Sequence, residues 1–316
     1  MTVFYFLVQQ MMYFVIPLMV VALGGMFSER SGIVNIALDG TMIAGAFVAT
    51  VFLNKTQGLW SGQSQLLAAL LIAGLSGMIF ILPHAFSAVT LGTSQMISGI
   101  ALNLIAPAMS IFFARIIFDS MRIPFKNTFM LTKVPVLGDI PLIGRMFFQN
   151  AYITTYLGII IMLVSWYVVF KTRFGLRLRS SGEYPQATAA VGINVKHLRY
   201  AGVLISGFLA GMGGIIFVVP TSNVFTGTVA GYGFLALSVL VFGQWRPHKI
   251  FYSALLFGLA KSISSAYSAI PFLVSLNLPS EVYKMMPYVF TIFMLILTSR
   301  NPQAPRAAGK AYISSE

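Results

Sequence analysis

Long apolar runs follow one another along almost the whole chain, separated by short polar segments. Of its 316 residues, 58% are hydrophobic and only 9% are charged, whereas an ordinary soluble domain is about 25% charged. A soluble fold of this length could not bury so much apolar surface, so the sequence predicts an all-α, polytopic transmembrane helical bundle. Since a span needs about 20 apolar residues, we expect about nine spans, within a range of eight to ten. The candidate spans are 7–27, 33–53, 65–84, 94–118, 152–170, 201–220, 229–243, 250–270 and 283–299.

Basic residues gather in one long polar segment, 171–199. A polar segment of this length cannot lie in lipid, and an excess of Lys and Arg marks cytoplasmic segments, so we expect it on the cytoplasmic side. Alternation of the spans then places the short tail 300–316 inside as well. It places the Pro-rich loop 119–151 and the N-terminus outside. The cations concerned are Lys171, Arg173, Arg177, Arg179, Lys196 and Arg199 in the segment, and Arg300, Arg306 and Lys310 in the tail.

Polar side chains interrupt two of the apolar runs at helical spacing. Asn35 and Asp39 lie four residues apart in the run 33–53, and their polarity marks it as a span that could be broken. Gln95 and Asn103 share a face of the fourth run. Polar groups inside a membrane either face a water-filled path or hydrogen-bond between helices. Both interpretations stay open for these four residues.

Small residues recur in the run 201–220, where Gly207 and Gly211 form a G-x-x-x-G pair and Gly214 continues the pattern. Small residues at this spacing let helix backbones approach closely. We therefore interpret these glycines as helix-packing positions.

For several charged and aromatic residues we favour a structural role over a functional one. The adjacent Glu29 and Arg30 are interpreted as a local interfacial charge pair, and Trp245 as an interfacial anchor. Lys261 lies inside a span, on a face that also carries serines such as Ser268. It either meets a polar substrate or, as we favour, pairs with a carbonyl or an acid.

Several classes of function lack their motifs. There is no G-x-x-x-x-G-K-[ST] phosphate loop, no nucleophile elbow, no Cys, and no His spacing suited to a metal. The sequence therefore predicts no ATP site, no metal and no enzyme. The net charge of +13 does not predict nucleic-acid binding, because the cations lie in short loops beside apolar spans.

Four motifs in order carry a resemblance to a known family. They are ERSGIVNIALDG after the first span, EYPQATAAVGINVKHLR in the basic segment, then SGFLAGMGG, and finally GYGFLALSVLVFGQWRP. Together they resemble the permease subunits of bacterial ATP-binding-cassette (ABC) importers, in the branch shared by branched-chain amino acid and ribose uptake. The chain looks most like the nucleoside (simple-sugar-type) permeases, over roughly residues 15–300. Asp39 stands where that family more often has Glu.

The resemblance implies a single transmembrane permease domain, 1–316, in the bacterial plasma membrane. It implies that a second, homologous permease completes the pathway, that a separate ATPase hydrolyses the ATP, and that an extracytoplasmic substrate-binding lipoprotein delivers the cargo. This chain would bind no cofactor itself. A coupling helix near 183–195 would dock in the ATPase, with basic flanks at the lipid headgroups. The residues carried over for docking are Glu183, Ala187, Ala190 and Gly192.

The expected path is neutral and hydrogen-bonding. Its candidate residues are the polar Asn35, Asp39, Gln95 and Asn103, together with three aromatic residues available to stack on a base, Phe225, Tyr232 and Phe234. The alternatives are an importer of the same class that carries a simple sugar such as ribose, a secondary transporter or channel, and a membrane-embedded enzyme.

Overall fold

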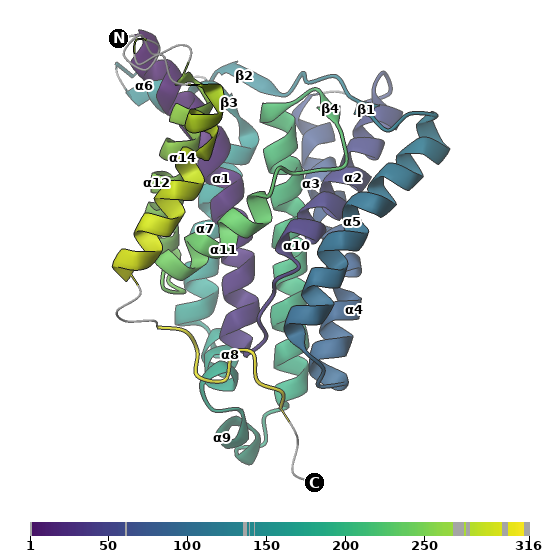
Figure 1. Cartoon of the computed structure of the whole chain (residues 1–316), viewed down its shortest axis with the longest axis vertical. Helices are drawn as coiled ribbons and strands as arrows, with labels where there is room; N and C mark the ends of the chain where they lie inside the picture. Colours follow the sequence, from purple (N-terminus) through teal and green to yellow (C-terminus); the bar gives the residue numbers. More distant parts are fainter. Residues whose placement is uncertain are drawn as a thin grey trace.

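The computed structural model is a bundle of helices that run mostly along one axis (Figure 1). It describes residues 2–60, 62–134, 138, 140–141, 143–267, 275, 279–298 and 303–312; Ser268 and Arg300 lie outside these residues. The elements are α1 (Thr2–Ser31), α2 (Leu38–Thr56), α3 (Gln63–Phe80), α4 (Leu82–Ala85), the π-helix η1 (Phe86–Thr90), α5 (Gln95–Phe118), β1 (Ile123–Pro124), β2 (Met130–Lys133), α6 (Ile143–Phe147), β3 (Gln149–Tyr152), α7 (Ile153–Lys171), α8 (Arg173–Glu183), α9 (Pro185–Ala190), α10 (Val195–Thr221), β4 (Val224–Phe225), α11 (Tyr232–Phe242), α12 (Pro247–Ser265) and α14 (Ser280–Thr298).

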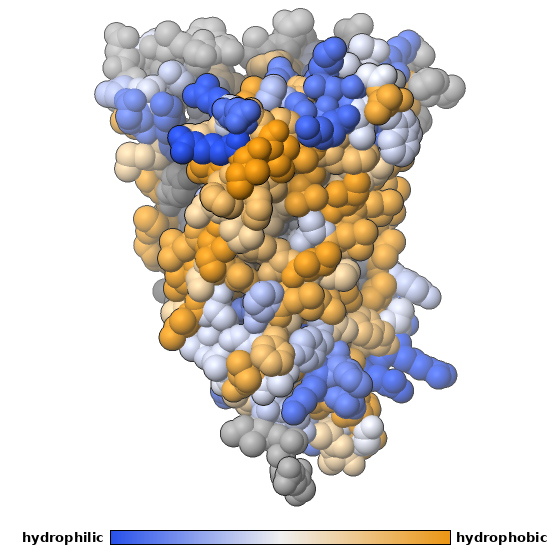
Figure 2. All heavy atoms as spheres, turned by 90° about the vertical axis from the view of Figure 1, so that its right-hand side faces the viewer, coloured by the Kyte–Doolittle hydropathy of each residue, from blue (hydrophilic) through white to orange (hydrophobic). Residues whose placement is uncertain are grey.

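Among the described residues, five helical stretches are long and apolar enough to cross a membrane: Tyr5–Ser31, Gln63–Thr90, Gln95–Phe118, Ile153–Lys171 and Val195–Thr221. Figure 2 shows the face that carries α5, where a broad apolar band lies between two polar ends. A surface of this kind suits lipid in the middle and water at both ends. The predicted class, a mostly helical multi-pass membrane protein, is confirmed, while the count of about nine spans stays a prediction.

Two helices, α2 and α11, begin in the middle of the bundle rather than at an end (Figure 1). The chain leaves α1 at Ser31 and runs without helix through 32–37 before α2 starts. The far end of α2 reaches β1, where Asn54 Nδ2 donates to the Pro124 carbonyl (2.7 Å). The end of α11 points the other way, because Trp245 just beyond it contacts the last turn of α1. The two half-helices therefore run in opposite directions from one central region.

Helices α1 and α10 form the centre of the bundle and pack along each other. Close approach to α10 depends on its glycines. A Cβ at Gly207 would lie 2.9 Å from the carbonyl oxygen of Gly77 in α3, and a Cβ at Gly214 would lie 2.1 Å from the carbonyl oxygen of Met42 in α2. Gly211 packs against α3 in the same way, 2.2 Å from the carbonyl oxygen of Ala73. These glycines thus lie where backbone meets backbone.

Short strands and α6 cover one end of the bundle, which we call the cap end. Strand β1 pairs antiparallel with β4, with Ile123 opposite Phe225, and β2 pairs antiparallel with β3. These two-stranded sheets depart from the all-α expectation. Backbone groups of loop 119–151 are satisfied by residues 224–225 in the first sheet and by the later residues 149–152 in the second. The N-terminus lies at the cap end (Figure 1), on the same side as 119–151, as the alternation of spans predicts.

The opposite end carries α8, α9 and residues 303–312, and we call it the α9 end (Figure 1). Segment 171–199, expected as a polar loop, is mostly helical, and α10 already starts at Val195. The expected coupling helix 183–195 is shorter than predicted: α9 spans only Pro185–Ala190. Pro185 causes this division, because the residue before a proline is driven out of helical geometry, and Tyr184 has φ −141° and ψ 84°. Glu183 consequently ends α8.

Candidate functional site

The break between α1 and α2 exposes backbone groups deep in the bundle. Nonhelical backbone at membrane depth is tolerated only where protein or water satisfies it. At the start of the break, Ser28 supplies both partners of Ile33: its carbonyl accepts from the Ile33 N–H (3.2 Å) and its hydroxyl donates to the Ile33 carbonyl (2.7 Å). Gly32 opens the break with φ +101°, a left-handed conformation that favours glycine.

Three amide side chains hold the rest of the break. Gln95 Oε1 accepts from the N–H of Val34 (2.7 Å). Asn35 Oδ1 accepts from the N–H of Ala37 (3.0 Å), while its Nδ2 donates to the Ser206 hydroxyl on α10 (2.8 Å). Of the two interpretations left open, these contacts correspond to hydrogen bonding within the protein.

Asn103 on α5 bridges the end of the break and the start of α2. Its Oδ1 accepts from the N–H of Gly40 (2.7 Å), and its Nδ2 donates to the carbonyl of Ile36 (2.9 Å). The first N–H groups of a helix have no partner within the helix. Asn103 therefore caps α2 from a neighbouring helix and fixes the angle at which the chain enters it.

Asp39 joins the two half-helices. It lies in the first turn of α2, is 8% exposed, and its Oδ1 accepts from the N–H of Gly233 in the first turn of α11 (2.9 Å). A carboxylate at this place is stabilised by the partial positive charge of both helix N-termini. The helices meet so closely that a Cβ at Gly233 would lie 2.3 Å from the Asp39 Cα. Gly233 was not among the predicted site residues; its signal in the sequence is the GYG motif before an apolar run, whose glycines favour close packing.

The three candidate aromatic residues do not share one surface. Tyr232 is fully buried at the start of α11, with its ring centroid 4.0 Å from that of Phe217. Phe225 is buried in β4 at the cap end, whereas Phe234 is 49% exposed. Lys261 on α12 faces the Tyr232 ring, with its Nζ 6.0 Å from the centroid. Of the three, Tyr232 is the one that is buried where the half-helices meet.

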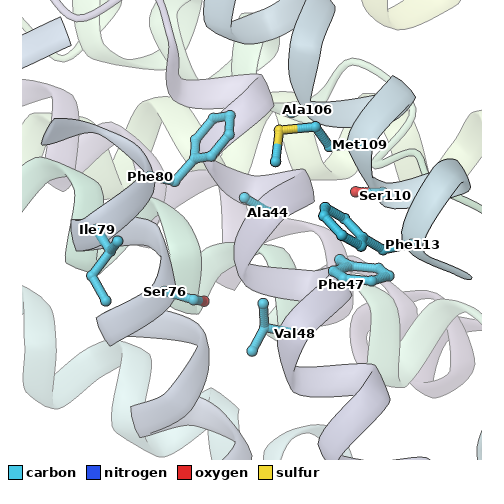
Figure 3. Close-up of a pocket in the computed structure, with 10 residues that line it drawn as sticks. All are labelled: Ala44, Phe47, Val48, Ser76, Ile79, Phe80, Ala106, Met109, Ser110 and Phe113. Carbon is cyan, nitrogen blue, oxygen red and sulfur yellow. The ribbon is translucent and has the colours of Figure 1, made fainter. Parts of the chain in front are cut away.

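An apolar cavity of about 400 Å³ lies beside α2, between α3 and α5 (Figure 3). Its polar side chains are two serines, and Ser76 already donates its hydroxyl to the Ala73 carbonyl (2.9 Å). None of the candidate path residues lines this cavity, so it is separate from the polar site in the break. The lining residues are Ala44, Phe47, Val48, Ser76, Ile79, Phe80, Ala106, Met109, Ser110 and Phe113.

At the α9 end, residues from three segments meet around Trp245. Its Nε1 donates to Glu29 Oε2 (2.6 Å), and its carbonyl accepts from Arg30 Nη2 (3.1 Å). Arg30 also lies 3.9 Å from Glu183 Oε1. Glu29 and Arg30 therefore connect α1 with the turn after α11 and with the end of α8. Glu29 and Arg30 lie more than 150 positions before Glu183 and Trp245 in the sequence, so no local motif predicts this cluster.

Three of the four expected docking residues lie on one small projection, whereas Glu183 ends α8 and contacts Arg30 and Arg306 of its own chain. Ala187, Ala190 and Gly192 are exposed on and just after α9, while Thr188 turns back and donates its hydroxyl to Ser180 Oγ (3.1 Å). Gly192 takes φ +80°, and a Cβ there would meet nothing within 4 Å. The projection thus presents small side chains to a partner. Within the described part of the chain, no three His, Asp or Glu residues group as a metal site.

Comparison with known proteins matches most of this chain to one family. The family model described as branched-chain amino acid transport system / permease component matches residues 7–297. Nucleoside ABC transporter permease protein NupC of Lactococcus lactis subsp. cremoris (strain MG1363) is 41% identical over 311 residues, which are 98% of this chain and 97% of that protein. Guanosine ABC transporter permease protein NupQ of Bacillus subtilis (strain 168) is 41% identical over 304 residues, 95% of this chain and 94% of that protein. Nucleoside ABC transporter permease protein NupB of the same Lactococcus strain is 25% identical over 311 residues, 95% of this chain and 81% of that protein.

Proposed function

This chain belongs to the permease family of branched-chain amino acid transport systems, and from that membership we propose that it forms the membrane pathway of an ABC importer for nucleosides. The observation that carries the cargo assignment is the 41% identity to NupC and to NupQ over nearly the whole length of each protein. One of these relatives is named for nucleosides and the other for guanosine. A simple sugar such as ribose is the alternative cargo.

The importer needs subunits beyond this chain. A second, homologous permease completes the pathway; NupC and NupB, two permeases from one strain that both resemble this chain, support a heterodimer. An ATPase subunit hydrolyses ATP, an extracytoplasmic lipoprotein delivers the cargo, and this chain contributes no catalytic site or cofactor.

In the plasma membrane, the α9 end faces the cytoplasm and the cap end faces outward. The cations of 171–199 at the α9 end support this orientation through the positive-inside rule. Nine spans result when α2, α11, α12 and α14 are counted with the five long helices, since each half-helix together with its nonhelical neighbour traverses the bundle. The described part of the C-terminal tail is then cytoplasmic.

The region where α2 and α11 meet is the proposed gate of the pathway. Discontinuous helices whose N-termini converge near the bilayer midplane are a recurring way to build a transport site. Here Asp39, Asn103 and Tyr232 lie at that convergence. Their contacts give the two half-helices a shared, polar junction that can change when the bundle switches between inward- and outward-facing states.

Transport in proteoliposomes tests this function. We expect the complete complex, with ATPase, second permease and binding protein, to accumulate radiolabelled guanosine only when ATP is supplied on the ATPase side. Omission of the ATPase is the control. Accumulation without the ATPase, driven by an ion gradient, would identify a secondary transporter instead. ATP-dependent uptake of radiolabelled ribose, with no uptake of guanosine, would identify a sugar importer.

The projection around α9 makes a separate prediction. Replacing Gly192 with Trp adds bulk where the chain itself has open space, so the permease keeps its packing while docking to the ATPase is lost. We expect the ATPase to stop co-purifying with this variant. The matched control is Gly58→Trp, because Gly58 also has positive φ (+96°) and nothing within 4 Å of its Cβ position, but lies between α2 and α3. Equal ATPase recovery from both variants would contradict the docking assignment.

A further inference from the structure

The C-terminal segment 303–312 lies across the α9 end and binds the end of α8. The N–H of Ala307 donates to the carbonyl of Gly182 (2.9 Å), and the N–H of Arg306 donates to Glu183 Oε2 (3.4 Å). Glu183 is therefore engaged inside the chain, by Arg306 on one side and by Arg30 on the other. A carboxylate held in this way anchors the tail.

The side chain of Arg306 extends this attachment to the joint between α8 and α9. Its guanidinium carbon lies 5.4 Å from the centroid of the Tyr184 ring, and its Nη1 donates to the Tyr184 hydroxyl. Stacking of Arg on an aromatic face is favourable even at exposed sites. Tyr184 is the residue that separates α8 from the projecting α9, so Arg306 binds the base of the projection.

The same segment is attached to the break between α1 and α2. The N–H of Gly309 donates to the carbonyl of Gly32 (3.2 Å), the first residue of the break. Ala307, two residues earlier in the segment, makes the contact with Gly182. One short stretch of backbone thus joins the end of the coupling region to the start of the nonhelical segment that leads to Asp39.

Arg199 on α10 gives the segment a third attachment. Its side chain is 1% exposed, its Nη1 donates to the carbonyl of Lys310 (3.0 Å), and its guanidinium carbon lies 5.8 Å from the Tyr312 ring centroid. Among the described residues no hydrogen-bond partner exists for its Nε and Nη2. A buried cation is costly unless nearby groups compensate it, so the tail carbonyl and ring are part of what makes this Arg tolerable. Gly32 leaves room for it, because a Cβ there would lie 2.9 Å from Arg199 Nη2.

We propose that residues 303–312 are a positioning strap for energy coupling, which holds the α8–α9 joint at a fixed distance from the α1–α2 break and from α10. The proposal rests on the proposed import function. When the ATPase displaces the α9 projection, the strap makes the break move with it. Without the strap, α8 stays linked to α1 by the Ser181 hydroxyl, which donates to the Ser31 carbonyl (3.1 Å), by the Arg30–Glu183 pair and by the packing of Gly182 against the Arg30 carbonyl. The part of the motion that is lost is the part that the strap transmits to the break and to α10.

Three variants of the full complex separate coupling from assembly. The first ends at residue 302, the second is Arg306→Ala, and the control is Lys310→Ala, which removes an exposed cation but keeps the carbonyl that Arg199 binds. We expect the first two to co-purify with the ATPase and to hydrolyse ATP, while guanosine taken up per ATP falls by about tenfold, the scale of ordinary coupling free energies. Lys310→Ala retains the wild-type ratio of guanosine taken up to ATP hydrolysed.

Because the chain contains no Cys, a fourth variant, Tyr184→Cys with Arg306→Cys, can be cross-linked by a short bis-maleimide. The cross-link reconnects the tail to the α8–α9 joint, and we expect it to rescue coupling.

Each outcome bears on the strap separately from the import function. Failure of the wild-type complex to take up nucleoside refutes the proposed function before any variant is compared. With a working wild type, an unchanged uptake-to-ATP ratio in the shortened chain overturns the strap. Loss of ATPase binding in that chain also overturns it, because the segment then serves assembly. If the cross-link does not restore coupling, the proposed role of the Arg306–Tyr184 contact at the α8–α9 joint is overturned.

Discussion

Replacing Gly233 with alanine is expected to abolish transport and to lower the thermal stability of the permease. The added Cβ would lie 2.3 Å from both the Cα and the backbone nitrogen of Asp39. Backbone cannot move aside as a side chain can, so the cost exceeds the about 1–3 kcal/mol of ordinary overpacking in a core. Separation of α2 from α11 also breaks the hydrogen bond from the Gly233 N–H to Asp39. ATP-dependent guanosine uptake in proteoliposomes and thermal unfolding in detergent measure the two effects.

Gly231→Ala is the matched control for this substitution. Gly231 lies two residues away and has φ +72°, but a Cβ there would meet nothing within 4 Å. It therefore suffers only the strain of a left-handed conformation, about 1–2 kcal/mol. If Gly233→Ala and Gly231→Ala behave alike, close contact between the half-helices is not what the junction requires.

The second large effect is expected at Asn103. Changing it to Leu keeps the size of the side chain but leaves the Gly40 N–H and the Ile36 carbonyl without their partner. Each buried group left unsatisfied costs about 1–3 kcal/mol, so we expect a marked drop in the melting temperature and loss of uptake. Asn54→Leu is the control, because Asn54 makes one exposed hydrogen bond at the cap end. A melting temperature for Asn103→Leu equal to that of the control would mean that the break does not depend on this amide.

The sequence indicated that the span 33–53 could be broken, but not where the break lies or what it contacts. Polar residues in an apolar run are costly in lipid, which is why Asn35 and Asp39 suggested an interruption. Where the break lies, at 32–37, depends on amides from α5 and a serine from α10. The Asp39–Gly233 contact joins residues 194 positions apart, and a single sequence contains no signal for such a pair.

The coupling region was predicted in the same partial way. Its cations indicated a membrane side, and Pro185 determined where α8 stops and α9 starts. Glu183 was expected to face the ATPase, yet its carboxylate contacts Arg30 and Arg306 of its own chain. Composition assigns a charged residue to a surface, whereas the identity of its partner depends on how distant segments fold together. The tail, expected only as a short polar end, contacts α8, α10 and the α1–α2 break for the same reason.

The hydrogen bonds that α5 and α10 make to residues 32–37 have a consequence for how the protein is made. A polytopic chain leaves the ribosome N-terminus first, so α1 and α2 reach the membrane before α5 and α10 exist. Until Gln95, Asn103 and Ser206 have been synthesised, the Val34 N–H, the Ile36 carbonyl and Asn35 Nδ2 lack the partners that they have in the folded bundle, and lipid cannot supply any. We therefore expect the segment between the first two spans to reach its final arrangement only after α5 and α10 have been made. Folding of this permease would then be cooperative across most of its length.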